Sequence, residues 1–172
     1  MHAPIHTFAS ALRQAQDWIT DVAVSNRTDD REFAYRLLRA WLHTVRDRIP
    51  VDSTAHMGAQ LPSLLRGVLY EGWQPAAVPK RHGLASFVTQ FATSARIDPL
   101  EVPAFAGATT TALRRRFSHG QLDHVFEVLP ERIRSVLRGE YPLTFPIDEG
   151  DEDYFLDGNA DRDAERPSSV EF

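Results

Sequence analysis

The chain has 172 residues, of which 42% are hydrophobic and 25% are charged, and its formal net charge is −5. A chain of this size and composition can bury a hydrophobic core as one domain or as two small ones. It contains no cysteine, which excludes disulfides, thiol catalysis and thiolate metal sites and favours a compartment that is not oxidising.

The first two elements are predicted to be helices with an apolar face. Apolar residues spaced by three or four predict a helix from about Thr7 to Ser25. Asp29 stands three residues before Glu32, which predicts a capping box at the start of the second helix. That helix is expected to run to about Arg48 and to end at Pro50, because proline lacks an N–H and clashes with the preceding turn. Its apolar face comprises Phe33, Leu37, Trp41, Val45 and Ile49.

Two shorter helices are predicted to follow. Asp52 or Ser53 is expected to cap a short third helix. Pro62 is expected to open a fourth, because a residue in the first turn loses nothing by lacking an N–H. Gly72 is expected to end that helix in the left-handed conformation.

A second set of helices is predicted after residues 74–83, which contain two prolines and no periodicity and therefore indicate an extended linker. Asp98 and Glu101 form another capping box. Pro103 falls in the second turn after this box, so the helix is expected either to start late or to be kinked there.

Two further helices complete the second set. Ser118 and Gln121 predict a capping box for the first of them. Pro130 is expected to open the second, and Gly139 to end it. After Tyr141 the sequence contains acids, proline, glycine and serine without periodicity, which predicts an acidic, largely irregular tail that is partly disordered.

The two sets of helices resemble each other in sequence. Residues 18–32 are similar to 87–101 at an offset of 69, and residues 60–69 to 128–137 at an offset of 68. An internal repeat determines architecture. The sequence therefore predicts an all-α fold in which two tandem four-helix repeats form a pseudo-two-fold helical bundle. The expected ranges are 1–73 for the first repeat, 74–83 for the linker, 84–140 for the second repeat and 141–172 for the tail.

Several motifs resemble a bacterial protein family. The chain reads R-D-R-I-P at residues 46–50 and Q-L-P-S-L-L-R-G-V-L-Y-E-G-W at residues 60–73. These segments are similar to the domain of unknown function 2267 family, whose members carry such a long helix, a leucine–proline step and an E-G-W turn. The resemblance covers roughly residues 15–140 and departs at Pro103 and in the tail. It implies a helical bundle but no reaction, because the family has no established activity.

Arginines gather at the ends of the two long helices. Arginines in the last turn of a helix interact favourably with the negative end of the helix dipole. Alternatively, these arginines contact an anion or a phosphate backbone. Alternatively the tail lies on them, because residues 1–140 hold 17 basic and 14 acidic residues whereas 141–172 hold 2 and 10. The residues concerned are Arg46, Arg48, Arg114, Arg115 and Arg116, and the first two are expected on the side of their helix away from the core.

For two further candidate sites, a role in helix capping or packing is an alternative to a binding function. Glu71 and Trp73 flank the glycine that ends the fourth helix, so Trp73 either folds back on that helix or forms the lip of a groove with Glu71 as an acceptor.

His56 and His124 occupy equivalent positions in the two repeats. The His-Glu-x-x-His and Glu-x-x-His patterns of metal-binding helices do not occur, so we expect no metal and no cofactor. Both histidines are expected to cap or pack at the third helix of each repeat.

Sequence motifs for phosphate loops, dinucleotide binding and the nucleophile elbow are absent. Without a long apolar run or a signal peptide, the protein is expected in the cytoplasm and not in a membrane. We expect a non-enzymatic protein-interaction or scaffold module that binds a protein partner or itself. The alternative is a protein that binds an anion, small ligand or nucleic acid through the arginine-rich helix ends, with the tail as a screen. An enzyme with a site near His56 and His124 is a third hypothesis.

Overall fold

The computed structural model describes residues 6–80 and 83–142. Over these ranges the chain folds into eight α-helices and two short 3-10 helices and contains no strand, which confirms the predicted all-α class. The α-helices are α1 His6–Ser25, α2 Arg31–Arg46, α3 Val51–Gln60, α4 Ser63–Tyr70, α5 Leu84–Ala95, α6 Val102–Arg114, α7 Gln121–Glu127 and α8 Glu131–Arg138. The 3-10 helices are η1 Pro75–Ala77 and η2 Pro99–Glu101.

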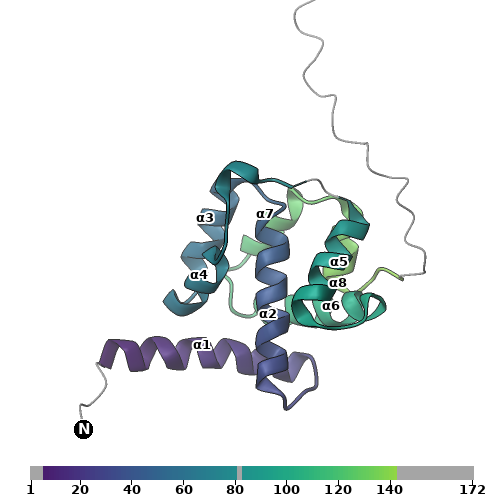
Figure 1. The fold of residues 1–172 in the computed structure, drawn as a ribbon. Helices are drawn as coiled ribbons and strands as arrows, with labels where there is room; N and C mark the ends of the chain where they lie inside the picture. The colour runs from purple at the N-terminus through teal and green to yellow at the C-terminus, as the bar shows by residue number, and fades with distance from the viewer. Residues whose placement is uncertain (1–5, 81–82, 143–172) are drawn as a thin grey trace, which may run out of the picture.

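Helix α2 forms the centre of the molecule. In Figure 1 it stands between α3 and α4 on one side and α5, α6 and α8 on the other. Leu37, Trp41 and Val45 on its apolar face are fully buried, as predicted. The indole N–H of Trp41 donates to Thr110 Oγ1 on α6 at 2.8 Å. Because neighbours enclose α2 on both sides, every residue from 41 to 49 is buried, including the polar ones.

Helices from the first and second half of the chain pack on each other. Helix α1 packs on α6, α5 packs on α2, and α3 contacts α7. Aromatic pairs join the halves: Phe33 meets Phe105 edge-on with ring centroids 5.2 Å apart, and Trp18 meets Phe117 at 5.6 Å. The helices therefore share one hydrophobic core. The division into two four-helix repeats with the ranges given above stays a prediction.

The starts of α2 and α3 differ from the predicted caps. Asp30, and not Asp29, caps α2 by accepting the backbone N–H three residues further on. Helix α3 begins directly after Pro50, so Asp52 and Ser53 lie inside its first turn and neither is the cap residue. Pro50 itself is the N-cap residue, with a ψ of 156°, and no side chain caps the helix.

In the second half one predicted capping box is confirmed and one is wrong. Asp98 and Glu101 bond reciprocally around η2, and α6 begins after it. Pro103 therefore lies in the first turn of α6, so the late start is the correct alternative. Ser118 does not cap α7, because its hydroxyl instead donates to Gln60 Oε1 at 2.7 Å and joins the turn after α6 to the end of α3.

Helices α6 and α8 approach each other through two glycines. Gly139 ends α8 with φ 75°, as predicted. A Cβ built on Gly107 in the middle of α6 would lie 2.6 Å from the Cα of Gly139, closer than atoms can pack. The contact therefore requires glycine at position 107. The predicted tail lies outside the described residues from position 143 onward.

Candidate functional site

The last turn of α2 carries charged side chains into the protein interior. Arg46 is 4% exposed. It donates to the backbone carbonyls of Leu69 and Glu71, at and just beyond the end of α4, and to Asp47 Oδ1 at 3.0 Å. The last carbonyls of a helix have no partner within it, so Arg46 caps α4 internally. The expectation that Arg46 lies on the outer side of α2 was wrong, because α4 covers that side.

Asp47 links three parts of the chain. It is 5% exposed. Its Oδ2 accepts hydrogen bonds of 2.9 Å from Lys80 Nζ in the linker and from Gln90 Nε2 on α5, and its carbonyl accepts from the backbone N–H of Lys80 at 2.7 Å. Burial raises the pKa of the Asp47 carboxyl, but the bonds from Lys80, Arg46 and Gln90 outweigh this, so the pKa lies below its ordinary value. The ionised carboxylate therefore holds the linker against α2 and α5.

Arg48 is fully buried. Its Nη1 donates to Gln90 Oε1 at 2.7 Å and its Nη2 to Ser86 Oγ at 3.1 Å, both on α5. The guanidinium lies 5.2 Å over the ring of Phe87. Burial lowers the pKa of Arg48 to about 10, and its Nε has no hydrogen-bond partner among the described residues. The predicted outer position of Arg48 was therefore wrong as well, because α5 covers it.

The arginines at the end of α6 are exposed and lie apart from the buried pair. Arg114 pairs with Asp123 at 2.9 Å. Arg116 donates through Nε to Asp21 Oδ2 on α1 at 2.6 Å, which raises the pKa of the guanidinium. The side chain of Arg115 is exposed, and no residue of the described part of the chain is its partner. The five predicted arginines thus do not form one cluster.

Arg116 lines an open groove of about 370 Å³ between α1 and the α3–α4 turn. We call it the α1 groove. Trp18 and Leu61 line it but are almost fully buried, at 6% and 2% exposed. Amide and charged side chains supply the remaining part of its lining. The full lining is Gln14, Asp17, Trp18, Gln60, Leu61, Pro62 and Arg116.

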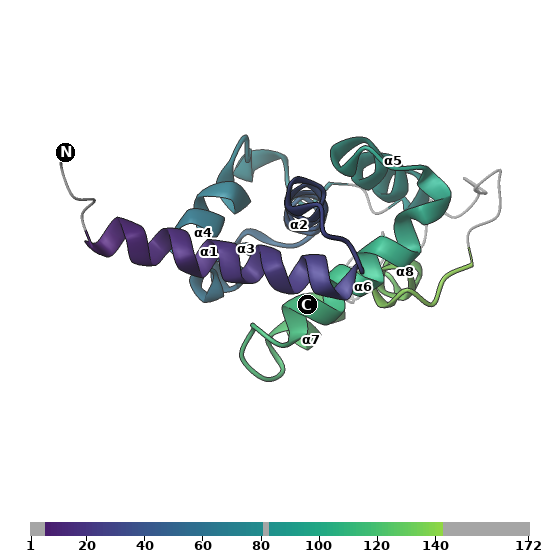
Figure 2. The same cartoon turned by 90° about the horizontal axis from the view of Figure 1, so that it is seen from below.

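The first two turns of α1 extend past the body, as Figure 2 shows. Phe8 and Leu12 are 68% and 51% exposed. They lie on the same helical face as Ala15 and Val22, which are buried. We call Phe8 and Leu12 the α1 overhang. The overhang continues an apolar face that the rest of α1 packs against the body, but it has no such cover from the described residues.

The turn after α4, which contains Glu71, Gly72 and Trp73, has the conformation of a helix end. Gly72 has φ 64°, the backbone N–H of Trp73 donates to the Tyr70 carbonyl at 3.1 Å, and the rings of Tyr70 and Trp73 lie 5.3 Å apart. Trp73 therefore folds back on the helix, which is the first of the two alternatives given above. Arg39 Nε donates to Glu71 Oε2 at 3.0 Å and lowers the pKa of that carboxyl, so an internal cation already engages Glu71.

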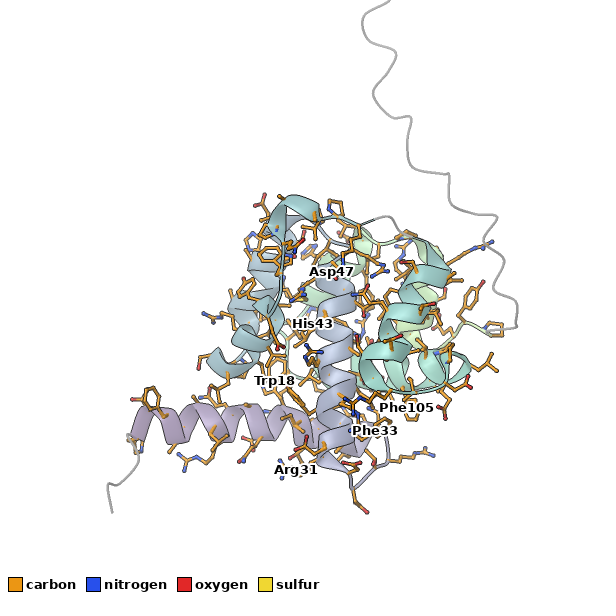
Figure 3. All side chains as sticks on the ribbon, viewed as in Figure 1. Trp18, Arg31, Phe33, His43, Asp47 and Phe105 are labelled. Carbon is orange, nitrogen blue, oxygen red and sulfur yellow. The ribbon has the colours of Figure 1, made fainter. Side chains whose placement is uncertain are left out.

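The histidines are arranged differently from the prediction. His56 and His124 are exposed on α3 and α7, so they do not pack at the helix junctions. His43, which sequence reasoning did not single out, is 7% exposed, and its Nε2 donates to the Val68 carbonyl at 2.7 Å. Figure 3 shows His43 and Asp47 on α2. Within residues 6–80 and 83–142 no three metal-ligating side chains come together.

Within the same described ranges no helix has the length and apolar character needed to cross a membrane.

A family model described as "Uncharacterized conserved protein (DUF2267)" matches residues 15–136 of the chain. The match includes α2 with its buried charged turn and nearly all of the α1 groove. A search among curated proteins found no matching relative.

Proposed function

The chain belongs to the DUF2267 family, and on that premise we propose that it is a non-enzymatic helical module that binds a protein partner or a second copy of itself. The α1 overhang carries this proposal. Two large apolar side chains, Phe8 and Leu12, stay exposed on a face that is buried further along the same helix. An amphipathic helix gains stability by burying such a face, and exposed apolar patches on proteins commonly mark interaction sites.

The α1 groove adds polar recognition to this apolar surface. Gln14 and Asp17 follow the overhang on α1, and Gln60 faces them across the groove. The Gln14 amide can both donate and accept, whereas Gln60, whose Oε1 accepts from the Ser118 hydroxyl, would contribute its N–H groups as donors to the backbone of a bound segment. Asp17 follows Phe8 by nine residues and therefore lies on the opposite side of α1, so the groove would contact a different part of the partner than the overhang does.

We further propose that the module consists of two four-helix repeats related by a pseudo-two-fold axis. Two repeat-equivalent residues support this: Arg27 and Arg96 both adopt a left-handed conformation, with φ 52° and 59°. The residue after each donates its backbone N–H at 3.1 Å to the carbonyl of a matched alanine, Ala23 or Ala92. Left-handed arginine is uncommon, so its recurrence at matched positions supports a common local fold.

The alternative, binding of an anion, small ligand or nucleic acid by the arginine-rich ends, has less support. Arg46 and Arg48 are buried and bond protein groups. Arg114 and Arg116 pair with carboxylates. Arg115 alone of the five is exposed without a partner in the described ranges, and a single cation gives little affinity for a phosphate backbone.

A photo-crosslinking amino acid at position 12 tests the proposed surface. Expressed in the native host, the labelled chain should form one discrete cross-link, either to another protein or to a second copy. Phe8→Ser in the same chain should abolish it. Val24→Ser is the matched control, because Val24 is 66% exposed on α1 but lies away from the stripe. Absence of a protein cross-link at position 12, or equal loss with Val24→Ser, would count against the proposal.

A further inference from the structure

Residues 6–14 extend α1 beyond the part of this helix that recurs in the second half of the chain. Helix α1 begins at His6, whereas α5, its equivalent in sequence, begins at Leu84. At the offset of 69 residues Leu84 corresponds to Ala15. The family match also begins at residue 15. Two separate observations thus place residues 6–14, which carry the α1 overhang, outside the repeated unit.

The overhang presents an apolar face that contains no charged group. Phe8 and Leu12 are four residues apart, so they are neighbours on the same side of α1. They are 68% and 51% exposed. Arg13, the one arginine of residues 6–14, follows Leu12 directly and therefore points about 100° away from it. A surface of this kind fits another apolar helix face and offers nothing to an acidic or basic ligand.

A second copy of the chain supplies such a face with matching dimensions. Phe8 and Leu12 lie symmetrically about position 10, which is also the midpoint of residues 6–14. With a two-fold axis beside Ser10 and the two α1 helices antiparallel, Phe8 of each copy meets Leu12 of the other. Residues 6–14 of both copies then overlap over about 13 Å at 1.5 Å per residue. The overlap stops at Ala15, the first residue of α1 that the body buries.

Helix α4 provides a further apolar side chain next to this contact. It packs on α1 and lies beside the first half of that helix in Figures 1 and 2. Its Leu64 is 46% exposed. The first turn of the partner's α1 would end close to α4, so each copy would bring a third exposed apolar residue to the edge of the interface.

The size of this contact fits a reversible dimer. A fully covered aromatic side chain buries about 150–250 Å², so Phe8, Leu12 and Leu64 each offer on the order of 100 Å². With the helix surface around them the two copies would bury roughly 1,000 Å², below the standard interface of about 1,600 Å². Interfaces of the standard size bind with micromolar or higher affinity. We therefore expect a dissociation constant of about 10–100 µM for this smaller one.

We infer that the α1 overhang is a dimerisation element, through which two copies of this chain associate reversibly by antiparallel contact of residues 6–14. The contact is isologous, as in most homodimers, since the same patch of each copy faces the axis. This inference rests on the proposed function, because it names the occupant of the same surface as a second copy and not a different protein.

Sedimentation velocity of the purified full-length chain between about 5 and 500 µM, a range that brackets the expected dissociation constant, tests the dimer. The mean sedimentation coefficient should rise with concentration. Phe8→Ser and Leu12→Ser should each weaken association about tenfold or more, as loss of a central interface residue does, and Leu64→Ser should weaken it less. All three side chains are exposed, so these variants should fold.

Val24→Ser is the matched control, because Val24 is 66% exposed on α1 but lies outside residues 6–14. It should leave the association unchanged. A chain that stays monomeric over the whole concentration range, or equal weakening by Val24→Ser and Phe8→Ser, would overturn the inference.

The absence of cysteine allows a test of the antiparallel register. The axis beside Ser10 sets position 8 of one copy opposite position 12 of the other. When chains with Phe8→Cys and chains with Leu12→Cys are mixed and mildly oxidised, the disulfide between the two variants should exceed the disulfides within each variant. A preference for like pairs, or disulfide yields no higher than those of Val24→Cys chains, would refute the antiparallel contact.

The outcomes distinguish this inference from the proposed function. A cross-link from position 12 to a different protein alone, together with a monomeric purified chain, would support the interaction module and reject the dimer. A concentration-dependent dimer that Phe8→Ser weakens, without any protein cross-link in the native host, would support the dimer and reject the partner-binding role there.

Discussion

Arg48 and Arg116 make matched contacts from the ends of α2 and α6, but they bond different chemical groups. Arg48 donates to the neutral Gln90 and Ser86 and is fully buried. Arg116 donates to the carboxylate of Asp21, and its side chain is 34% exposed. Similar sequence positions therefore produce a desolvated cation held by neutral acceptors in one half and a partly hydrated ion pair in the other.

The same conservative substitution should therefore have different effects at the two sites. Arg48→Lys keeps a buried charge but loses the two-armed geometry that reaches Gln90 and Ser86 together, so we expect it to lower the free energy of unfolding by about 1–3 kcal/mol. Arg116→Lys changes a partly exposed pair and should cost less than about 1 kcal/mol. Urea unfolding at neutral pH measures both. If the two substitutions lowered the free energy of unfolding equally, the burial of Arg48 would not determine how much it contributes to stability.

We expect the free energy of unfolding to depend more on the buried carboxylate of Asp47 than on an exposed one such as Asp123. Asp47→Asn removes the negative charge between Arg46 and Lys80, and removing one partner of a buried ion pair costs about 3–5 kcal/mol. Asp123→Asn removes an exposed pair with Arg114 and should cost less than about 1 kcal/mol. Denaturant unfolding of the two variants makes the comparison, and similar losses would show that the buried network is not important for stability.

Asp47 also predicts acid sensitivity. Its folded pKa lies below the ordinary value of 3.8. The unfolded chain therefore binds the proton more readily, and the stabilisation is present above about pH 4 and is lost as the pH falls through the folded pKa. Asp47→Asn should show a smaller loss of unfolding free energy than the native chain between pH 4 and pH 2.

His43 should produce a separate step closer to neutral pH. Burial lowers its pKa below 6.5; the Val68 carbonyl and Glu71 partly oppose this, whereas Arg46 and Arg39 add to it. The folded state thus favours the neutral ring, so stability is complete above pH 6.5 and falls as the pH drops through the folded pKa. His43→Gln should reduce the decrease between pH 7 and pH 5. An unchanged decrease in urea titrations at the two pH values would exclude His43 as its source.

The contact between α6 and α8 should tolerate no side chain. Gly107→Ala places a Cβ 2.6 Å from the Gly139 backbone, and such overpacking costs about 1–3 kcal/mol or more. Gly67→Ala is the matched control, because the added Cβ on α4 would meet no atom within 4 Å apart from its chain neighbours and its own helix backbone. That change should stabilise by about 0.4–1 kcal/mol. Thermal unfolding should move the two midpoints in opposite directions.

Much of the helical fold could be predicted from the sequence because the signals are local. The spacing of Leu37, Trp41 and Val45 identifies a buried helix face within a few residues of chain. The Asp98 box and the end of α8 at Gly139 depend on backbone groups within one turn. The cap of α3 was mispredicted because Pro50 itself is the N-cap residue and no side chain caps that helix.

The candidate site was less accessible to sequence analysis. Arg116 was identified, but the other residues of the groove come from α1 and the α3–α4 turn, and no local pattern brings them together. Arg46 and Arg48 were assigned to an outer surface because a helix packed on one side exposes its polar face. The packing of α4 and α5 against α2 reversed this assignment.

By itself the sequence determined which residues form helices and which face of the long helix is apolar, because both depend on neighbours along the chain. Only the tertiary structure decided which charged side chains are buried and which apolar ones remain exposed. Burial of Arg48 requires α5 to cover the end of α2, and exposure of Phe8 requires α1 to extend past the body. Both depend on how far each helix reaches over its neighbours, which its own periodicity does not specify.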